Sequence, residues 1–267
     1  MTQSIPIPAA PVVLITGAAK RIGRCIALTM AQRGWDVAIH FHQSESHARE
    51  LAAEIVAFGR RAICVSADLS DQDAVKQLVP RVVAGLGSVQ CVVNNASSFE
   101  VDTAADFSHA LLDHHMHINL AAPVLLAQAL YDATAETTQD GRQSCVINIL
   151  DQKIFNLNPD FFSYTLSKAA LQCATTTLAQ ALAPKVRVVG IAPGTTLPSI
   201  HQDDSNFAKT HQYAALDQSS TPQDIADAVH YLASARAVTG TILAVDGGQH
   251  LIPLARDVMY AVNGVTP

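Results

Sequence analysis

The stretch VVLITGAAKRIG, Val12 to Gly23, joins a short apolar run to the start of a helical pattern. Unbroken apolar runs of this length are typical of parallel strands that are buried on both faces of a sheet. The same pairing recurs along the chain, which predicts strands at 12–15, 37–41, 62–65, 89–93, 144–150, 186–191 and 241–245. Helices are expected at 21–33, 45–58, 71–86, 104–137, 161–183 and 222–234.

This alternation predicts an α/β fold with a doubly wound parallel sheet, a Rossmann fold, because parallel strands need crossover helices between them. We expect a single domain over residues 1–267, since no Pro/Ser-rich linker and no solenoid repeat interrupts the pattern. The least regular part lies near 193–220, before a helix start at Thr221-Pro222. Ligands of such sheets bind outside the carboxyl ends of the strands, so this segment is the expected substrate loop.

The composition excludes several classes of protein. Hydrophobic residues make up 49% of the chain and charged residues 15%, which suits a large core covered by helices. The net charge is −6 and the Lys and Arg side chains do not cluster, so nucleic acid is not an expected partner. The five cysteines form no C-x-x-C pair, which indicates buried thiols in a reducing compartment. With no signal peptide and no apolar run of ~18 residues, we expect a cytoplasmic protein with no membrane partner.

The segment TGAAKRIG, Thr16 to Gly23, lies directly between the first expected strand and the first expected helix. A dinucleotide pyrophosphate needs close backbone approach and free N–H groups at a helix N-terminus, and glycines at this turn allow both. Gly17 and Gly23 are two such glycines, whereas Arg21 stands where a third is usual, so the plain G-x-G-x-x-G pattern is absent. The position of the segment between a strand and a helix nevertheless predicts a dinucleotide-binding turn.

The end of the second expected strand, IHFHQS at 39–44, carries no carboxylate. Sites that prefer NAD place an acidic side chain there for the ribose 2′-hydroxyl. Side chains suited to hold a 2′-phosphate stand here and in the first turn instead: His40, Ser44, Lys20 and Arg21. This predicts NADPH as the cofactor. His40 and His42 would share one face of a strand, but no third ligand is recognisable nearby and no metal site is expected.

A tyrosine and a lysine one helical turn apart, Tyr164 and Lys168, lie in an expected helix that Asp151 precedes. Positions i and i+4 share a helix face, so the phenol and the ammonium can point into one pocket. A phenol titrates near ~10 and arrives protonated at neutral pH, and a nearby cation would lower its pKa toward the working range. Asp68 and the run NNASSF at 94–99 also fall at carboxyl ends of strands, although Asp and Asn are common in turns as well.

Together these motifs resemble the short-chain dehydrogenase/reductase superfamily over nearly the whole chain. The motifs that carry the resemblance are T-G-x-x-x-x-x-G at 16–23, Asp68-Leu69, N-N-A at 94–96, Asn119 in a long helix, Tyr164-x-x-x-Lys168, Pro193-Gly194 and D-G-G at 246–248. The resemblance implies cofactor contacts from Gly17, Lys20, Arg21, Ile22, His40, Ser44, Asp68, Leu69, Asn95, Ala96, Lys168, Pro193 and Gly194.

Within that superfamily the chain is similar to the pteridine reductases and the bacterial dihydrofolate or dihydromonapterin reductases. The likeness rests on the arginine in the first turn, HFHQS after the second strand, NNASSF after the fourth, and Asp151 where most of the superfamily has its catalytic serine. It implies that Asn119 holds a water in a proton relay, that Lys168 binds the nicotinamide ribose and that Tyr164 donates the proton. The substrate site would be lined by Arg21, Ser97, Phe99, Asp151 and Tyr164, with Phe99 stacking on a flat heterocycle. The chain departs from the subgroup at Gln43, where an arginine is usual, and in 152–162 and 195–218.

We therefore expect an NADPH-dependent reductase that transfers a hydride to a small heterocycle such as a pterin or dihydropteridine. Asp151 favours a nitrogen heterocycle because a carboxylate pairs with ring N–H and amino groups, and burial would raise its pKa and let it donate a proton. A simple turn-capping role for Asp151 is the alternative. Two other functions stay open: a reductase of a 3-oxoacyl thioester or a keto sugar, and a regulatory protein that binds NADPH without turnover.

Four histidines precede Asn119, at 109, 114, 115 and 117, and they spread around the expected helix instead of aligning at i and i+4. We interpret them as polar or interfacial side chains and not as metal ligands. The family resemblance also implies a homotetramer in which the helices that contain Asn119 and Tyr164 pack across a twofold axis.

Overall fold

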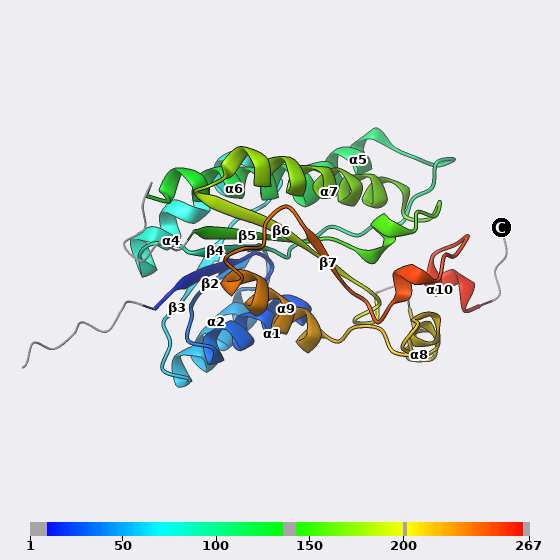
Figure 1. Ribbon diagram of the computed structural model, residues 1–267, viewed down its shortest axis with the longest axis horizontal. Helices are drawn as coiled ribbons and strands as arrows, with labels where there is room; N and C mark the ends of the chain where they lie inside the picture. Colours follow the sequence, from blue (N-terminus) through cyan, green and yellow to red (C-terminus); the bar gives the residue numbers. More distant parts are fainter. Residues whose placement is uncertain (1–9, 136–142, 200–201, 264–267) are drawn as a thin grey trace, which may run out of the picture.

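The computed structural model describes residues 10–135, 143–199 and 202–263, and a parallel sheet forms its centre (Figure 1). Within these residues the sheet has seven strands in the order β3-β2-β1-β4-β5-β6-β7. The strands are β1 (Val12–Ile15), β2 (Asp36–Phe41), β3 (Ala62–Ser66), β4 (Cys91–Asn94), β5 (Ser144–Ile149), β6 (Val186–Pro193) and β7 (Ile242–Val245). The predicted doubly wound Rossmann fold is therefore confirmed, and each strand lies where the sequence placed it.

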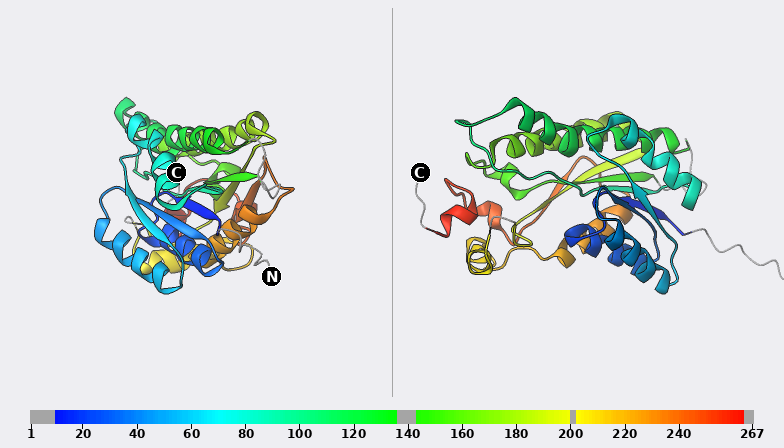
Figure 2. Two further views of the ribbon diagram at one scale, coloured as in Figure 1. Left: turned by 90° about the vertical axis from the view of Figure 1, so that its left-hand side faces the viewer. Right: turned by 180° about the vertical axis from the view of Figure 1, so that it is seen from behind.

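Helices cover both faces of this sheet, as Figures 1 and 2 show. One face carries α1 (Arg21–Gln32), α2 (Glu45–Ala57) and α9 (Pro222–Ser234). The other carries α4 (Leu78–Leu86), α6 (Ala122–Ala133) and α7 (Phe162–Leu182). Side chains of β1 alternate between the two layers: Val13 and Ile15 pack under the first group, and Val12 and Leu14 pack under the second. Burial on both sides explains why the strands appear in the sequence as unbroken apolar runs.

Two of the expected helices are interrupted. The helix expected at 71–86 is divided into α3 (Gln72–Lys76) and α4, because Pro80 has no N–H to donate to the carbonyl of Lys76. The helix expected at 104–137 begins only at α5 (His109–Met116), where Ser108 Oγ accepts a hydrogen bond of 3.1 Å from the Leu111 N–H. A π-helical turn, His117–Ala121, then joins α5 to α6. Residues 136–137 of that expected helix lie outside the described residues.

The expected substrate loop near 193–220 is more regular than its composition suggested. It contains α8 (Asp204–Thr210) and a short 3-10 turn, His211–Tyr213, neither of which the sequence predicted. A further helix, α10 (Val258–Ala261), follows β7 and contacts α8, where Asn206 Nδ2 donates to the Met259 carbonyl at 2.8 Å. Figure 1 shows both helices together at one end of the molecule, beyond the layers that cover the sheet.

The strand order changes direction next to β1, which has β2 on one side and β4 on the other. Such a switch point opens a crevice at the carboxyl ends of the strands, and ligands of this fold bind there. No helix in the described part of the chain is long and apolar enough to span a membrane.

Candidate active site

The first turn packs tightly against the loop after β4. Gly17 has a φ of 61°, in the left-handed region that favours glycine. A Cβ on Gly17 would lie 3.1 Å from Ala96 Cα, and a Cβ on Gly23 would collide with the Gly17 carbonyl. The turn is also tied by Asn95, whose Nδ2 donates to the Thr16 carbonyl at 2.9 Å. These contacts explain why glycines stand at both positions and why Asn95 and Ala96 border the turn.

Arg21 adopts a φ of 54°, the left-handed conformation that explains why glycine is usual at this position. Its Nη2 donates a hydrogen bond of 2.9 Å to the carbonyl of Pro198, beyond the end of β6. Arg21 and Ile22 line the main cleft. Arg21 therefore lies on the expected substrate side, and the expected contribution to a 2′-phosphate site is not seen, because its guanidinium binds the Pro198 carbonyl instead.

His40 occupies a different place from the one expected. Its ring is buried, Nδ1 accepts a hydrogen bond of 3.1 Å from the Gly17 N–H, and Nε2 donates to the Ala67 carbonyl at 3.2 Å. Both ring nitrogens are thus engaged within the protein, and the prediction of a direct contact with a 2′-phosphate was wrong. Burial lowers the pKa of His40 to about 4, so the ring is neutral and supports the cofactor turn from behind.

A small hollow of about 280 Å³ lies beside the turn, between β1 and the end of β2. It is lined by Gly17, Ala19, Lys20, Phe41, His42, Gln43 and Ser44. Two of the four side chains expected at a 2′-phosphate, Lys20 and Ser44, meet here. A cation, a hydroxyl and the amide of Gln43 around one hollow are donors of the kind that a phosphate needs.

The loop after β3 borders the same edge of the sheet. Asp68 Oδ1 accepts hydrogen bonds from the N–H and Oγ of Ser70 at 2.8 and 2.7 Å, and these bonds lower the pKa of the carboxyl. Leu69 is buried behind it. Asp68 therefore stabilises this loop through its side-chain hydrogen bonds, as aspartate commonly does in turns.

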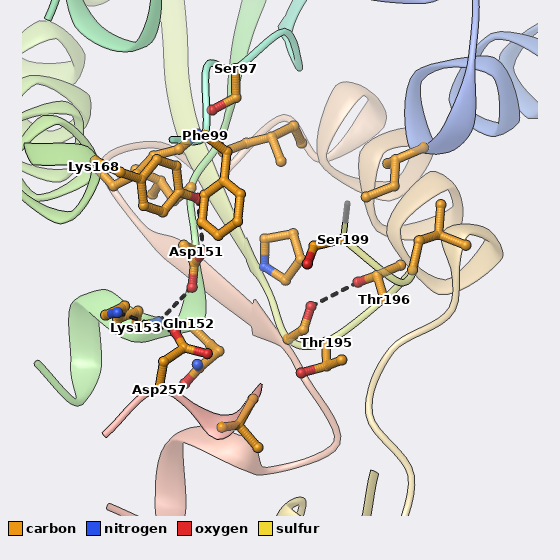
Figure 3. A pocket seen from close by; sticks show the side chains of 18 of the residues that line it. Ser97, Phe99, Asp151, Gln152, Lys153, Lys168, Thr195, Thr196, Ser199 and Asp257 are labelled. Carbon is orange, nitrogen blue, oxygen red and sulfur yellow. Dashed lines mark hydrogen bonds and ion pairs between the residues drawn. The ribbon is translucent and has the colours of Figure 1, made fainter. Parts of the chain in front are cut away.

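Three of the expected catalytic side chains meet at the base of the main cleft (Figure 3). The Tyr164 hydroxyl donates a hydrogen bond of 2.8 Å to Asp151 Oδ2. Lys168, one turn along α7, donates from Nζ to the Ile149 carbonyl at 2.8 Å and lies 5.7 Å from the centroid of the Tyr164 ring. The end of β5 and the first turns of α7 thus bring together residues that the sequence separates. Asp151 also caps the 3-10 turn Gln152–Phe155 by accepting from the Lys153 N–H at 2.8 Å.

The electrostatics of this trio differ from the expectation. Burial and the negative charge of Asp151 raise the pKa of Tyr164 well above its ordinary value, so the expected lowering by a nearby cation does not occur. Burial lowers the pKa of Lys168 to about 8, which makes it a weaker cation. Part of Asp151 faces the cleft, but protein surrounds its carboxyl group, and this burial raises its pKa despite the hydrogen bonds from Lys153 and Tyr164. The raised pKa of Asp151 is as expected.

Asn119 lies in the π-helical turn between α5 and α6, a geometry that often marks functional sites. Its side chain is buried and fully bonded. Oδ1 accepts from the Ser98 N–H at 2.9 Å and from Ser97 Oγ at 3.0 Å. Nδ2 donates to the Ser98 carbonyl and to Ser167 Oγ, each at 3.0 Å. The amide therefore fastens the loop after β4 to α7 near Tyr164, and any water in a relay would have to bind elsewhere on this turn.

Aromatic rings form one wall of the cleft. Phe99 stacks on Phe161 with ring centroids 4.3 Å apart, and its edge meets Tyr164 at 4.7 Å. Ser97 and Phe99 both line the cleft with Arg21, as expected for the substrate side. The cleft encloses about 320 Å³, at the lower end of the range for small-molecule sites.

Pro193 is the last residue of β6, Gly194 follows it, and both lie against the segment after β7. The Gly194 N–H donates to the Val245 carbonyl at 3.2 Å, and a Cβ on Gly194 would lie 2.8 Å from Asp246 Cβ. This close approach favours glycine at 194. Both residues line the cleft, as the resemblance implied.

Several residues of the cleft were not named individually from the sequence. Thr195 and Thr196 belong to the expected substrate loop near 193–220, and Lys153 belongs to the segment 152–162. Gln249, Asp257 and Met259 were not predicted at all. Lys153 is two positions from Asp151 and could have been inferred from that residue. Asp257 and Met259 follow the D-G-G motif at 246–248 by nine or more positions, and no local pattern in the sequence indicates that they return to the cleft.

No group of three side chains suited to a metal ion occurs in the described ranges. Of the four histidines before Asn119, His115 is buried, with Nδ1 2.9 Å from Ser163 Oγ and Nε2 accepting from the Glu100 N–H. The others are not buried, in keeping with the polar role expected for them. The prediction of buried thiols holds for Cys91 and Cys145 but was wrong for Cys173, which is exposed, and only partly right for Cys25 and Cys64.

Comparison with known proteins adds independent information. The model of the short chain dehydrogenase family matches residues 11–208. Among curated proteins, pteridine reductase 1 of Leishmania tarentolae is 31% identical over 287 residues, covering 91% of this chain and 98% of that protein. L-rhamnose 1-dehydrogenase (NAD(P)(+)) of Sphingomonas sp. (strain SKA58) is 30% identical over 246 residues, covering 90% and 96%.

Among solved structures, FolM alternative dihydrofolate reductase 1 of Brucella canis, complexed with NADP, superimposes with a TM-score of 0.84 at 40% identity. The match covers 90% of this chain and 94% of that one.

Proposed function

The chain belongs to the short-chain dehydrogenase family and is an NADP-dependent oxidoreductase, and we propose that it reduces a pterin or dihydropteridine. One observation carries the choice of substrate. At the position where most of the superfamily has a serine, Asp151 accepts a hydrogen bond from the catalytic tyrosine and faces the cleft. A carboxylate there pairs with ring N–H and amino groups, whereas a ketone offers only an acceptor.

The residues of the first turn fit a dinucleotide. Gly17 and Gly23 clear the space that a Cβ would fill, and the hollow beside them presents Lys20 and Ser44 for a 2′-phosphate. Asp68, Leu69, Asn95, Ala96, Pro193 and Gly194 would complete the cofactor edge, with Lys168 at the nicotinamide ribose. Bound NADPH supplies the hydride. The protein's own task is to orient the substrate ring and to hold a proton.

Tyr164 and Asp151 share that proton. Burial and the charge of Asp151 keep the Tyr164 phenol protonated, since both raise the pKa of the hydroxyl. A substrate whose N–H groups donate hydrogen bonds to Asp151 partly neutralises the charge of the carboxylate. This lowers the pKa of Tyr164 toward the range in which the phenol can donate a proton. Substrate binding thereby prepares the acid, with Lys168 as the neighbouring cation.

The aromatic wall suits a flat ring. Phe99 already stacks on Phe161 and meets Tyr164 edge to face, so its ring is held in place beside the proton donor. A planar heterocycle placed against Phe99 gains a stacking contact without ordering a flexible side chain. Arg21 and Ser97 add polar contacts at the rim of the same wall.

The direct test is NADPH oxidation by the purified protein with dihydrobiopterin, dihydrofolate, an acetoacetyl thioester and a keto sugar. We expect turnover with the first two. Turnover only with the thioester or the sugar would identify a carbonyl reductase, and cofactor binding without any turnover would identify a regulatory protein.

The Tyr164→Phe variant tests the assignment of the acid. Loss of a positioned general acid should lower kcat about 10²- to 10⁴-fold while the Kd for NADPH changes little. Full activity in this variant would contradict the role of Tyr164.

We also propose that the enzyme is cytoplasmic and forms a homotetramer through the layer of α5, α6 and α7. Exposed apolar side chains on that layer, such as Leu166 on α7, support an interface there. Light scattering coupled to size-exclusion chromatography measures the assembly, and a monomeric mass would exclude it.

A further inference from the structure

The C-terminal segment after β7 closes one side of the cleft. Asp257, Val258 and Met259 all line it, although none belongs to the layers that cover the sheet. Figure 3 shows Asp257 beside Gln152 and Lys153, with Asp151 between it and the Phe99 ring in this view. The cleft thus contains a second carboxylate in addition to the one that meets Tyr164.

Two ion pairs fasten this segment to the residues after β5. Arg256 binds Asp160 with both Nε and Nη2, at 2.9 and 2.7 Å. Asp257 Oδ2 lies 3.2 Å from Lys153 Nζ, which also donates to the Asp160 carbonyl at 2.6 Å. Bidentate pairs of this kind fix geometry as well as adding attraction. Asp257 is therefore held at a defined place relative to Asp151.

The carboxyl group of Asp257 keeps capacity to bind a ligand. Oδ1 accepts from the Met259 N–H at 3.2 Å and Oδ2 accepts from Lys153, one bond each. Each carboxylate oxygen can accept about two hydrogen bonds. Both side chains of the pair line the cleft, and the acid is the more accessible of the two, since Asp257 is 21% exposed and Lys153 only 3%.

Asp257 lines the same cleft as the reacting groups Asp151 and Tyr164. Burial is the main cause of the raised pKa of each of these two groups, and the negative charge of Asp257 adds to both shifts. Two carboxylates in one small cleft, with Lys153 beside them, can accept hydrogen bonds from several N–H groups on one face of a ligand.

We propose that Asp257 is a specificity-determining residue that binds an amino or ring N–H group of the substrate beyond the one bound by Asp151. The inference rests on the proposed function, and it narrows the substrate class to heterocycles with at least two separated N–H donor groups. Simple ketones and thioesters lack the second donor, so Asp257 contributes nothing to their binding.

The test compares Asp257→Asn with the wild-type enzyme on a dihydropteridine and on its analogue without the 2-amino group. Asparagine removes the charge and keeps one acceptor oxygen, which can bind Lys153 or the Met259 N–H but not both. We expect KM for the amino substrate to rise about 10- to 100-fold, the range for a hydrogen bond to a charged group, with kcat and the Kd for NADPH little changed. KM for the analogue should change less than threefold, roughly the effect of an uncharged contact.

Arg256→Gln is the matched control, because it breaks the neighbouring ion pair, while the Lys153 pair and the hydrogen bond of the Asp257 N–H to Asp160 Oδ2 still hold the carboxylate in the cleft. It should lower Tm while KM for the amino substrate stays within about threefold. An equal rise of KM on both substrates in Asp257→Asn, or the same rise in Arg256→Gln, would show a structural role and overturn the proposal.

The wild-type enzyme separates this inference from the proposed function. If none of the dihydropteridines supports NADPH oxidation, the proposed function is wrong, and the proposed role of Asp257 in substrate recognition is wrong with it. If it turns over both substrates with equal KM, the function stands and the role of Asp257 alone is refuted. The second result needs no variant, so a poorly folding Asp257→Asn leaves the proposal testable.

Discussion

The buried His40 makes the cofactor turn sensitive to acid. Burial lowers the pKa of His40 from 6.5 to about 4, while in the unfolded chain the ring keeps its ordinary pKa. Between those two values the unfolded chain binds more protons than the folded protein, so the free energy of unfolding falls as pH falls. At about 1.4 kcal/mol for each pH unit, the full loss from this one residue is about 3 kcal/mol, and it is complete below pH ~4.

The structure also gives the functional consequence. The unprotonated Nδ1 accepts the Gly17 N–H, and a protonated ring could not make this bond. Protonation would thus release the first turn of the dinucleotide site. Because the ring in the folded protein titrates only at about 4, affinity for the dinucleotide should change little between about pH 7 and about pH 5 and should weaken as the pH approaches about 4. Equilibrium dialysis with NADP⁺ at about pH 7, about pH 5 and about pH 4 measures this.

The His40→Asn variant provides the control for the stability measurement. Its side-chain oxygen can accept from the Gly17 N–H, but it does not titrate. We expect urea unfolding of the wild-type protein to lose about 2 kcal/mol more than the variant between pH ~7 and pH ~5, because all other titrating groups are shared. Equal losses in the two proteins would refute the assignment of the acid sensitivity to His40, whatever their absolute stabilities.

The remaining predictions concern the site. Asp151→Ser should lower kcat/KM for a dihydropteridine by at least about 10-fold and leave the Kd for NADPH nearly unchanged, whereas a gain in pteridine activity would disprove nitrogen recognition by this residue. Asn119→Ala leaves the Ser98 N–H and carbonyl and Ser167 Oγ without their buried partner, so it should cost about 2–5 kcal/mol of stability in urea unfolding. A cost below about 1 kcal/mol would show that the π-helical turn is held by its backbone alone.

Much of the fold could be predicted from the sequence because its signals are local. Buried parallel strands appear as apolar runs and their crossover helices follow each run, so the seven strands lie where expected. The helices were predicted less well where one residue changes the backbone, as at Pro80, or where a π-helical turn interrupts the pattern, as at Asn119. Neither α8 nor α10 has enough turns to show a helical period.

The candidate catalytic residues could be identified from their motifs, but their pKa shifts could not be predicted. The sequence shows Lys168 one turn from Tyr164 and predicts a lowered pKa for the phenol. Only the fold places the Asp151 carboxyl 2.8 Å from the hydroxyl and buries both, and burial with a negative neighbour outweighs the cation. The burial of His40 has the same origin, since solvent exposure depends on which segments cover a strand end.

The sequence by itself determined the order of strands and helices, the proposed dinucleotide turn from Thr16 to Gly23, and Tyr164 as the candidate proton donor, because each depends on residues close together in the chain. The tertiary structure alone decided which side chains share the cleft. Asp257 meets Lys153 from more than a third of the chain away, 104 positions along the sequence. Such a contact depends on the packing of whole elements, and packing leaves no local pattern from which it can be predicted.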